Sequence, residues 1–171
     1  PRIEAVEVVV VADTHLRSGL ARLPPRLIEA IAHSDAVVHA GDVVSLAVLT
    51  ELGQLAPLLA VLGNNDHELV GLLPEELGLE LGGVRVAVLH DSGPARGRPG
   101  RMAQRFPEAH LVIFGHSHVP VDEAGARSQW LFNPGSPTQR RAQPRPTFGR
   151  LTLEAGRVMA HTIEQLDPPA A

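Results

Sequence analysis

Five short apolar runs recur along the chain, and a polar or glycine-bearing cluster follows each of them at once. The runs are Val6–Ala12, Ala36–Ala40, Leu58–Leu62, Val84–Leu89 and Leu111–Phe114. Because they are short, rich in β-branched residues and not alternating, they predict strands buried on both faces. Two helix-like segments lie between the first three runs, at Arg26–His33 and at Ser45–Gln54. Alternation of strand, helix and strand predicts an α/β fold.

The last third of the chain has a different pattern. Gln129–Phe132, Thr147–Glu154 and Arg157–Glu164 look like strands, and Glu154–Gly156 is typical of a hairpin turn. We expect these strands to be antiparallel and to form a second sheet or an edge. No repeat or linker divides the sequence, so residues 1–166 are expected to form a single domain, followed by a disordered tail at residues 167–171.

The composition excludes several classes of function. The chain has no cysteine, and therefore no disulfide bond or thiolate metal site, and no lysine, and therefore no P-loop or Schiff base. The net charge of −4 and the few aromatic residues argue against a nucleic-acid surface. The longest apolar run, Val8–Ala12, is too short to span a bilayer, and no signal peptide is recognisable, so we expect a soluble, cytoplasmic protein without a membrane partner.

The polar clusters after the five runs carry side chains that bind metal ions. In open α/β sheets, ligands bind outside the carboxyl ends of the strands, so five such ends are expected to converge on one crevice. A single histidine or Gly-Asp pair in a loop is a weak signal, because such residues are common in turns, but five clusters in order are a specific one. The candidate ligands are Asp13, His15, Asp42, Asn64, His90, His116 and His118.

The types of ligand indicate which metals could bind. Carboxylate, amide oxygen and imidazole without thiolate suit manganese, iron, nickel or zinc, and seven ligands are too many for one such ion. They indicate a pair of ions bridged by a shared carboxylate. Two ions about 3.5–4 Å apart can hold a hydroxide between them and clamp a phosphoryl group. The one-residue gaps in Asp13-x-His15 and His116-x-His118 suit this arrangement, because residues two apart in an extended segment point the same way.

These motifs resemble those of the calcineurin-like metallophosphoesterases, and most closely their small bacterial and archaeal phosphodiesterase branch. The matching segments are Asp13-Thr14-His15, Gly41-Asp42, Gly63-Asn64, His90, Gly115-His116-Ser117-His118 and the turn Asn133-Pro134-Gly135-Ser136. The resemblance implies a four-layer α/β/β/α sandwich with two mixed β-sheets. It also implies two divalent cations, with manganese as the first choice, and in-line attack of a metal-bound hydroxide on phosphorus.

The resemblance further implies how the ligands are shared between the two ions. One ion would take Asp13, His15 and His118, the other Asn64, His90 and His116, and Asp42 would bridge them. The expected activity is hydrolysis of a small soluble phosphodiester. The alternatives are a phosphomonoesterase or phosphoprotein phosphatase, and a protein-interaction scaffold similar to the retromer subunit of this fold. A homo-oligomer is the assembly expected by analogy.

Two positions depart from the pattern of the family. Many members have a histidine after Gly-Asn, which stabilises the transition state or protonates the leaving oxygen, whereas this chain has Asn65. An amide can donate a hydrogen bond but cannot act as an acid, so we expect esters with good leaving groups to be hydrolysed best. His67 is a candidate replacement. The second departure is Asp91, where the branch has Gly-His after the histidine; it could orient His90, bind a metal, repel an anionic substrate or lie in an ordinary loop.

Three further groups of residues are candidates for supporting roles. Asp66 could hold a ligand histidine in one tautomer, or it could cap the turn in which it lies. Arg140 and Arg141 follow the Asn-Pro-Gly-Ser turn and could contact the substrate phosphate, as could the arginines of a Gly/Pro-rich loop around Arg98. Each arginine group could equally be a solvated loop. His39 is expected to be buried near the site and not to be a ligand.

Overall fold

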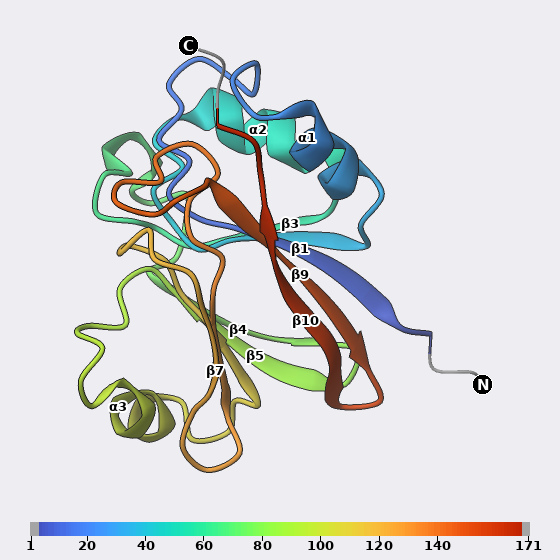
Figure 1. Ribbon diagram of the computed structural model, residues 1–171, viewed down its shortest axis with the longest axis vertical. Helices are drawn as coiled ribbons and strands as arrows, with labels where there is room; N and C mark the ends of the chain where they lie inside the picture. Colours follow the sequence, from blue (N-terminus) through green and yellow to red (C-terminus); the bar gives the residue numbers. More distant parts are fainter. Residues whose placement is uncertain (1–3, 169–171) are drawn as a thin grey trace.

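Two five-stranded sheets and three α-helices make up the computed structural model, which describes residues 4–168 (Figure 1). The first sheet has the order β10-β9-β1-β2-β3 and contains β1 (Val6–Val11), β2 (Ala36–His39), β3 (Leu58–Ala60), β9 (Thr147–Glu154) and β10 (Arg157–Gln165). The second has the order β4-β5-β6-β8-β7 and contains β4 (Glu76–Leu81), β5 (Val84–Leu89), β6 (Leu111–Ile113), β7 (Val121–Ala124) and β8 (Trp130–Asn133). The helices are α1 (Pro25–Ala32), α2 (Leu46–Leu55), α3 (Arg98–Arg105) and the 3₁₀ turn η1 (His67–Leu69).

Each sheet contains both parallel and antiparallel pairs. β1, β2 and β3 are parallel, and β9 joins β1 antiparallel, with Val6 opposite Leu153. In the second sheet β5, β6 and β8 are parallel, and β4 and β7 pair antiparallel at its edges. Both predicted helices form, and the Ser45 hydroxyl accepts a hydrogen bond from the Val48 N–H at the start of α2. The predicted α/β fold with two mixed sheets is confirmed.

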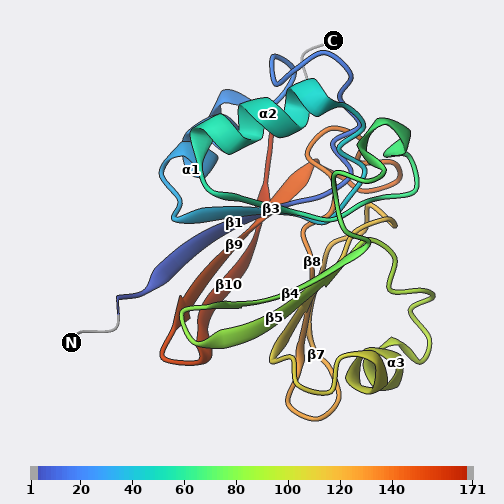
Figure 2. The same cartoon turned by 180° about the vertical axis from the view of Figure 1, so that it is seen from behind.

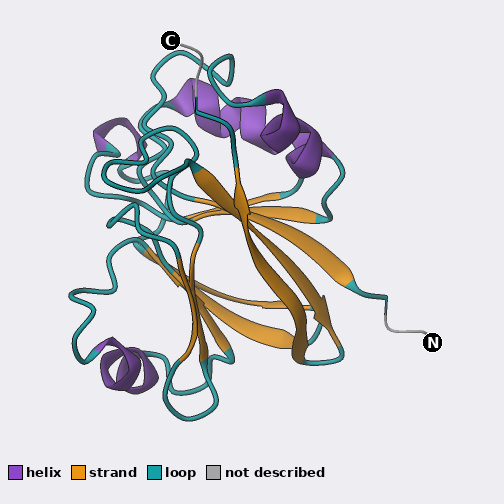
Figure 3. Cartoon of the chain, viewed as in Figure 1, coloured by secondary structure: helices purple, strands orange, loops and turns teal. Residues whose placement is uncertain are grey.

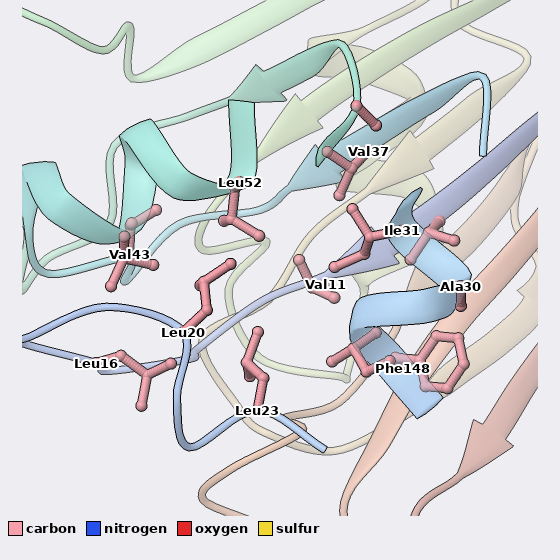
Figure 4. Packing of buried hydrophobic residues seen from close by; sticks show 14 of the residues in the cluster. Val11, Leu16, Leu20, Leu23, Ala30, Ile31, Val37, Val43, Leu52 and Phe148 are labelled. Atoms are coloured by element: carbon pink, nitrogen blue, oxygen red, sulfur yellow. The ribbon is translucent and has the colours of Figure 1, made fainter. Parts of the chain in front are cut away.

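Three hydrophobic clusters separate four layers. One lies between the first sheet and the helices α1 and α2, where Ile31, Leu52 and Phe148 are fully buried (Figure 4). A second fills the space between the two sheets, and a third lies between the second sheet and α3. Seen from behind, α1 and α2 cover one side of the molecule and α3 the other (Figure 2). The apolar runs are buried on both faces because each sheet is covered on both sides.

The prediction for the last third of the chain was only partly right. β9 and β10 form the expected antiparallel hairpin and lie at an edge of the first sheet, which is one of the two expected places. β8 is parallel to β6, because β7 reverses the chain before β8 enters the second sheet. β4, β7 and α3 were not predicted. Most of the predicted tail lies outside the described residues; Asp167, its first residue, pairs with Arg145 at 2.9 Å.

None of the helices in residues 4–168 is long and apolar enough to cross a membrane. The loops that follow β1, β2, β3, β5 and β6 gather on one side of the molecule (Figure 3). The fold therefore brings the five polar clusters of the sequence to the same side.

A close approach between the two sheets predicts the effect of a substitution at Gly149 on β9. A Cβ atom there would overlap the buried ring of Phe132 on β8, so Gly149→Ala is expected to lower the free energy of unfolding by about 1–3 kcal/mol. Gly53, in α2, has open space around it, and Gly53→Ala is expected to raise the free energy of unfolding by about 0.5–1 kcal/mol. Chemical denaturation of both variants measures the two changes, and equal effects would contradict this packing.

Candidate metal centre

The candidate ligands lie at the ends of strands from both sheets, and backbone hydrogen bonds tie their loops together. The Asp13 N–H donates to the carbonyl of Gly41, and the His15 N–H donates to the carbonyl of Asp42, which joins the loops after β1 and β2. The His116 N–H donates to Asp13 Oδ2 at 2.9 Å, which joins the loop after β6 to the first sheet. These loops therefore converge, as the sequence predicts.

Three buried ligand atoms lie together without hydrogen-bond partners. Asp13 Oδ1, His15 Nε2 and His118 Nε2 have no partner among the described residues. Asp13 Oδ1 lies 3.6 Å from His118 Nε2 and 3.9 Å from His15 Nε2. Buried polar atoms are normally paired, because leaving them unpaired costs free energy. Three such atoms from a carboxylate and two imidazoles fit a cation-binding site.

A second group of three ligand atoms lies beside the first. Asn64 Oδ1 is 2.9 Å from His90 Nε2 and 3.1 Å from His116 Nδ1, and the two ring nitrogens are 3.3 Å apart. Ligands at 2.0–2.2 Å from a metal ion are themselves about 3–3.6 Å apart. The spacing therefore suits ligands of one ion.

Asp42 lies between the two groups. Its Oδ2 is 3.4 Å from His15 Nε2 and 3.5 Å from His90 Nε2. A carboxylate oxygen in contact with one histidine from each group is in the position of a bridging ligand. The donor set and its spacing thus fit two cations that share Asp42.

The backbone at this site adopts an unfavourable conformation. Asp13, His15, Asp42, His116 and His118 have φ angles of 55°, 47°, 60°, 70° and 60°. Residues other than glycine rarely adopt the left-handed region, and such strain concentrates at functional sites. All five of these residues follow the end of a strand and are candidate ligands.

Two glycines of the motifs are explained by the close approach of ligands. A Cβ at Gly63 would overlap the backbone and the carboxylate of Asp42, and a Cβ at Gly41 would overlap the ring of His90. Gly41 also has a φ of 96°, which an L-residue rarely adopts. The Gly-Asp and Gly-Asn pairs are therefore needed for packing ligands together and not only for turning the chain.

Backbone carbonyls fix the orientation of two histidine rings. The Nδ1–H of His90 donates to the carbonyl of Ala40 at 2.8 Å, and that of His118 donates to the carbonyl of Gln139 at 2.5 Å. Each ring therefore presents Nε2 to the centre, as ligand histidines do when their other nitrogen is held. The Gln139 contact was not predicted, because any residue type supplies a carbonyl; only the match of the Asn-Pro-Gly-Ser turn pointed to this segment.

Asp66 supports the loops and does not orient a histidine. Its carboxylate accepts hydrogen bonds from the backbone N–H groups of Asp42, Val44 and Gly63, at 2.6–2.9 Å. It has no hydrogen bond or ion pair with a histidine among residues 4–168, so the tautomer-holding role is not observed. Instead it joins the loop of the bridging ligand to the loop that carries Asn64.

The side chains proposed for catalysis occupy different environments. Asn65 donates from its backbone N–H to Asp42 Oδ1 at 2.9 Å and from its amide to Asp42 Oδ2 at 2.8 Å. It therefore holds the bridging carboxylate from the side. His67 is exposed at the start of η1 and lines a hollow together with Asn64 and His90.

Asp91 faces a different histidine from the one expected. Its Oδ1 accepts a hydrogen bond from the Gly93 N–H, and its Oδ2 lies 3.8 Å from His116 Nε2, on the opposite side of the ring from the ligand atom Nδ1. The carboxylate is thus placed to influence His116 and not to orient His90, whose Nδ1 is held by Ala40.

The arginines expected in a loop near Arg98 lie partly in helix α3 and hold the chain after His90. The Arg98 guanidinium lies over the ring of Phe114, and its Nε donates to Ser92 Oγ at 2.9 Å. Arg101 donates twice to the carbonyl of Ser92, at 2.9 and 2.7 Å. The guanidinium groups of Arg98 and Arg101 donate hydrogen bonds within the protein. Their contacts therefore do not support a phosphate-binding role.

Arg140 and Arg141 differ in their surroundings. Arg140 donates to the carbonyl of Gln143 at 2.6 Å and so faces its own loop. The positive charge of Arg141 contributes to lowering the pKa of Asp13, His15 and His118, although burial has the larger effect on each of them. Of these two arginines, Arg141 is therefore the one whose charge acts on the candidate ligands.

The electrostatics of the protein without metal are unfavourable at this site. Burial raises the pKa of Asp13 to about 7 and lowers the pKa of both His15 and His118. Burial also acts to raise the pKa of Asp42, but hydrogen bonds from His90 and Asn65 outweigh it and keep that pKa below its ordinary value. The buried carboxylate of Asp13 and the imidazoles of His15 and His118, whose lowered pKa values favour their neutral forms, would be stabilised by a cation.

His39 is buried behind the ligands, as expected. Its Nδ1 accepts a hydrogen bond from the Gly41 N–H at 3.2 Å, and its Nε2 lies 3.0 Å from the hydroxyl of Thr14. Burial lowers its pKa to about 3, so the ring is neutral in the folded protein near pH 7. It links the loops after β1 and β2 and binds no metal-ligand group directly.

The raised pKa of Asp13 predicts how its replacement affects the metal-free protein. Its ordinary pKa of 3.8 applies to the unfolded chain and a value of about 7 to the folded one, so the folded state binds more protons between these values and loses stability as the pH rises. Metal-free Asp13→Asn is therefore expected to be more stable than the metal-free native protein at pH 8, by about 2–4 kcal/mol, and equally stable or less stable at pH 4.

Denaturation at both pH values, with Glu68→Gln as a control that removes a charge from the exposed surface, measures this difference. Added Mn²⁺ is expected to raise the melting temperature of the native protein and of Glu68→Gln but not of Asp13→Asn. A variant that is no more stable at pH 8, or that still responds to Mn²⁺, would contradict the proposed role of Asp13.

Comparison with known proteins gives the family. Residues 6–156 match the family model of the calcineurin-like phosphoesterase superfamily domain. A probable metallophosphoesterase of Methanocaldococcus jannaschii is 33% identical over 149 residues, which are 85% of this chain and 74% of that protein.

Two solved structures share the fold. One is an archaeal phosphodiesterase, with a TM-score of 0.73 and 25% identity over 94% of this chain and 99% of that one. The other is Vacuolar Protein Sorting 29 of Cryptosporidium parvum, with a TM-score of 0.75 and 18% identity over 95% and 99%. The chain therefore belongs to the calcineurin-like phosphoesterase superfamily.

Proposed function

We propose that the protein is a phosphodiesterase that uses two divalent cations to hydrolyse small soluble phosphodiesters. The observation that carries the proposal is the position of Asp42 Oδ2, in contact with His15 on one side and His90 on the other. One cation would be held by Asp13, His15 and His118, the second by Asn64, His90 and His116, and Asp42 would contact both. Such a pair supplies an activated water and neutralises phosphate oxygens.

Manganese is the proposed metal, with iron, nickel and zinc as alternatives. The support is the donor set, because oxygen and imidazole ligands without thiolate suit all four ions. The ligand rings are already oriented by the carbonyls of Ala40 and Gln139, so binding would need little rearrangement.

Asn65 and Arg141 would have two further roles beside the centre. Asn65 fixes the carboxylate of Asp42 through two hydrogen bonds and has no proton to give to a leaving oxygen. Departure of the alcohol then depends on its own acidity, which favours esters with good leaving groups. The positive charge of Arg141 acts on the pKa of Asp13, and the same charge would attract an anionic substrate.

A protein-interaction scaffold on the same fold is the principal rival, and a phosphomonoesterase is the second. All seven candidate positions carry side chains able to bind a metal, and their atoms converge. Retention of strained and unpaired groups is easier to explain by metal chemistry than by a scaffold role, because such groups lower stability.

The test is an activity assay of the protein reconstituted with Mn²⁺. Bis-nitrophenyl phosphate is expected to be hydrolysed faster than nitrophenyl phosphate, with cyclic nucleotides measured beside them. Asp42→Asn is expected to reduce kcat/KM at least about 100-fold, while Glu68→Gln leaves it unchanged. Preference for the monoester would favour the phosphatase alternative, and activity that survives in Asp42→Asn would contradict a centre bridged by this residue.

The two neighbouring arginines offer a matched pair of variants. Arg141→Ala is expected to raise KM for a phosphodiester about 3- to 10-fold with little change in kcat, because it removes attraction for the substrate before reaction. Arg140→Ala removes the same charge from a side chain that faces its own loop and is expected to change KM less than 2-fold. Steady-state kinetics at two salt concentrations measure both, and equal changes in the two variants would show that Arg141 has no special position.

A further inference from the structure

The end of strand β5 supplies two neighbouring side chains with different surroundings. His90 is buried and places Nε2 at 2.9 Å from Asn64 Oδ1, inside the second group of ligand atoms. Asp91, the next residue, has a side chain that is 57% exposed, and its carboxylate belongs to neither group of ligand atoms. The carboxylate therefore lies beside the candidate metal centre and is free to act on one of the ligands.

Hydrogen bonds hold the loop of Asp91 against the loop of His116. The Gly115 N–H donates to the carbonyl of His90 at 2.9 Å, which joins the residue before His116 to the residue before Asp91. The Gly93 N–H donates to Asp91 Oδ1 at 2.8 Å, so one carboxylate oxygen is used within its own loop. The other oxygen, Oδ2, lies 3.8 Å from His116 Nε2.

The two nitrogens of the His116 ring have different neighbours. Nδ1 lies 3.1 Å from Asn64 Oδ1 and 3.3 Å from His90 Nε2, within the second group of ligand atoms. Nε2 makes no hydrogen bond among residues 4–168, and its ion-pair partner there is Asp91. Backbone carbonyls hold the rings of His90 and His118. For His116, the carboxylate of Asp91 is the group in position to do the same.

The chemistry of imidazole shows what this carboxylate can do. A metal ion on Nδ1 needs the lone pair of that nitrogen, so the proton of the neutral ring must be on Nε2. An ionised carboxylate can only accept a hydrogen bond, and it therefore favours this tautomer. The distance of 3.8 Å is about 1 Å longer than such a hydrogen bond. Both side chains are about half exposed, so a small rotation of either closes the gap.

We propose that Asp91 is a positioning residue that accepts a hydrogen bond from the Nε2–H of His116 and thereby directs Nδ1 of this ring to the second cation. The inference rests on the two-cation centre of the proposed function, but not on the hydrolysis of any ester. A group that holds a ligand histidine in this way typically contributes about 10- to 100-fold to metal affinity. Because His116 lies with Asn64 and His90, only one of the two cations is affected.

The test compares Asp91→Asn with Asp91→Ala by calorimetric titration of the metal-free protein with Mn²⁺. Asparagine keeps an oxygen for the Gly93 N–H and then presents its NH₂ group to His116, where a second donor opposes a proton on Nε2. Alanine leaves the Nε2–H to water. The affinity for one Mn²⁺ ion is expected to fall about 10- to 100-fold in Asp91→Asn and less than about 5-fold in Asp91→Ala, while the other ion binds within about 2-fold of the native affinity.

Asp35 provides matched control variants. It is also exposed, and its Oδ2 accepts a hydrogen bond from the Glu7 N–H at 2.8 Å. It precedes β2, whereas the candidate ligand Asp42 follows that strand, so it lies at the far end from the centre. Asp35→Asn and Asp35→Ala are expected to keep the native affinity for both Mn²⁺ ions.

NMR of the protein loaded with Zn²⁺, which has no unpaired electrons, gives a second measurement that does not depend on activity. The nitrogen signal of His116 Nε2 is expected to shift in both Asp91 variants, because the acceptor of its hydrogen bond is removed. The nitrogen signal of His118 Nδ1, which donates to the carbonyl of Gln139, is expected to stay in place.

The order of the two Asp91 variants separates positioning from other roles. If the carboxylate only stabilised its own loop through Gly93, alanine would weaken Mn²⁺ binding more than asparagine. If only its charge mattered, the two variants would bind Mn²⁺ equally. Either result, or an unchanged Nε2 signal of His116, overturns the inference even if bis-nitrophenyl phosphate is hydrolysed. If both Asp91 variants behave as expected but no diester is hydrolysed with any of the four metals, the proposed function fails while the role of Asp91 stands.

Discussion

The candidate metal centre depends on the packing of one sheet against the other. Each group of three ligand atoms draws on both sheets: His118 follows β6 and joins Asp13 and His15, which follow β1, whereas Asn64, from the first sheet, joins two histidines of the second. Neither sheet alone supplies a complete group. The layer of valine, leucine and isoleucine side chains between the sheets therefore determines the distances between the ligands.

The packing of the two sheets also explains why the candidate site lowers the stability of the metal-free fold. The strand ends are brought so close that motif glycines must replace larger residues, and five ligand residues adopt left-handed backbone angles. Asp13 is fully buried and carries an oxygen without a partner among the described residues. Such features reduce the stability of the metal-free fold and are retained where they serve chemistry. The hydrogen bonds that Asp66 accepts from three backbone groups compensate for part of this cost.

Whether a feature of the fold or of the candidate site could be predicted depends on whether the sequence carries a side-chain pattern for it. The apolar runs were enough to predict the five strands that precede the candidate ligands, and the residues after them were enough to name the seven candidates, because burial and ligand chemistry are properties of side chains. The contacts made by the carbonyls of Ala40 and Gln139 were not predictable, since every residue has a carbonyl. The direction of β8 depended on β7, a short strand with mostly exposed residues and no apolar pattern. The roles of Asp66 and Asp91 depended on which loop lies opposite them, which one sequence does not specify.

The pairing of β1 with β9 has a consequence for the synthesis of the protein. β1 is the first of the described strands along the sequence, but one of its two neighbours in the sheet, β9, follows about 140 residues later, with Val6 opposite Leu153. Until β9 emerges, the outer edge of β1 has unpaired backbone groups and a strongly hydrophobic sequence, a combination that favours aggregation. β1, which is followed by Asp13 and His15, can thus reach its final place only after β9 has been made, and contacts of such long range form slowly.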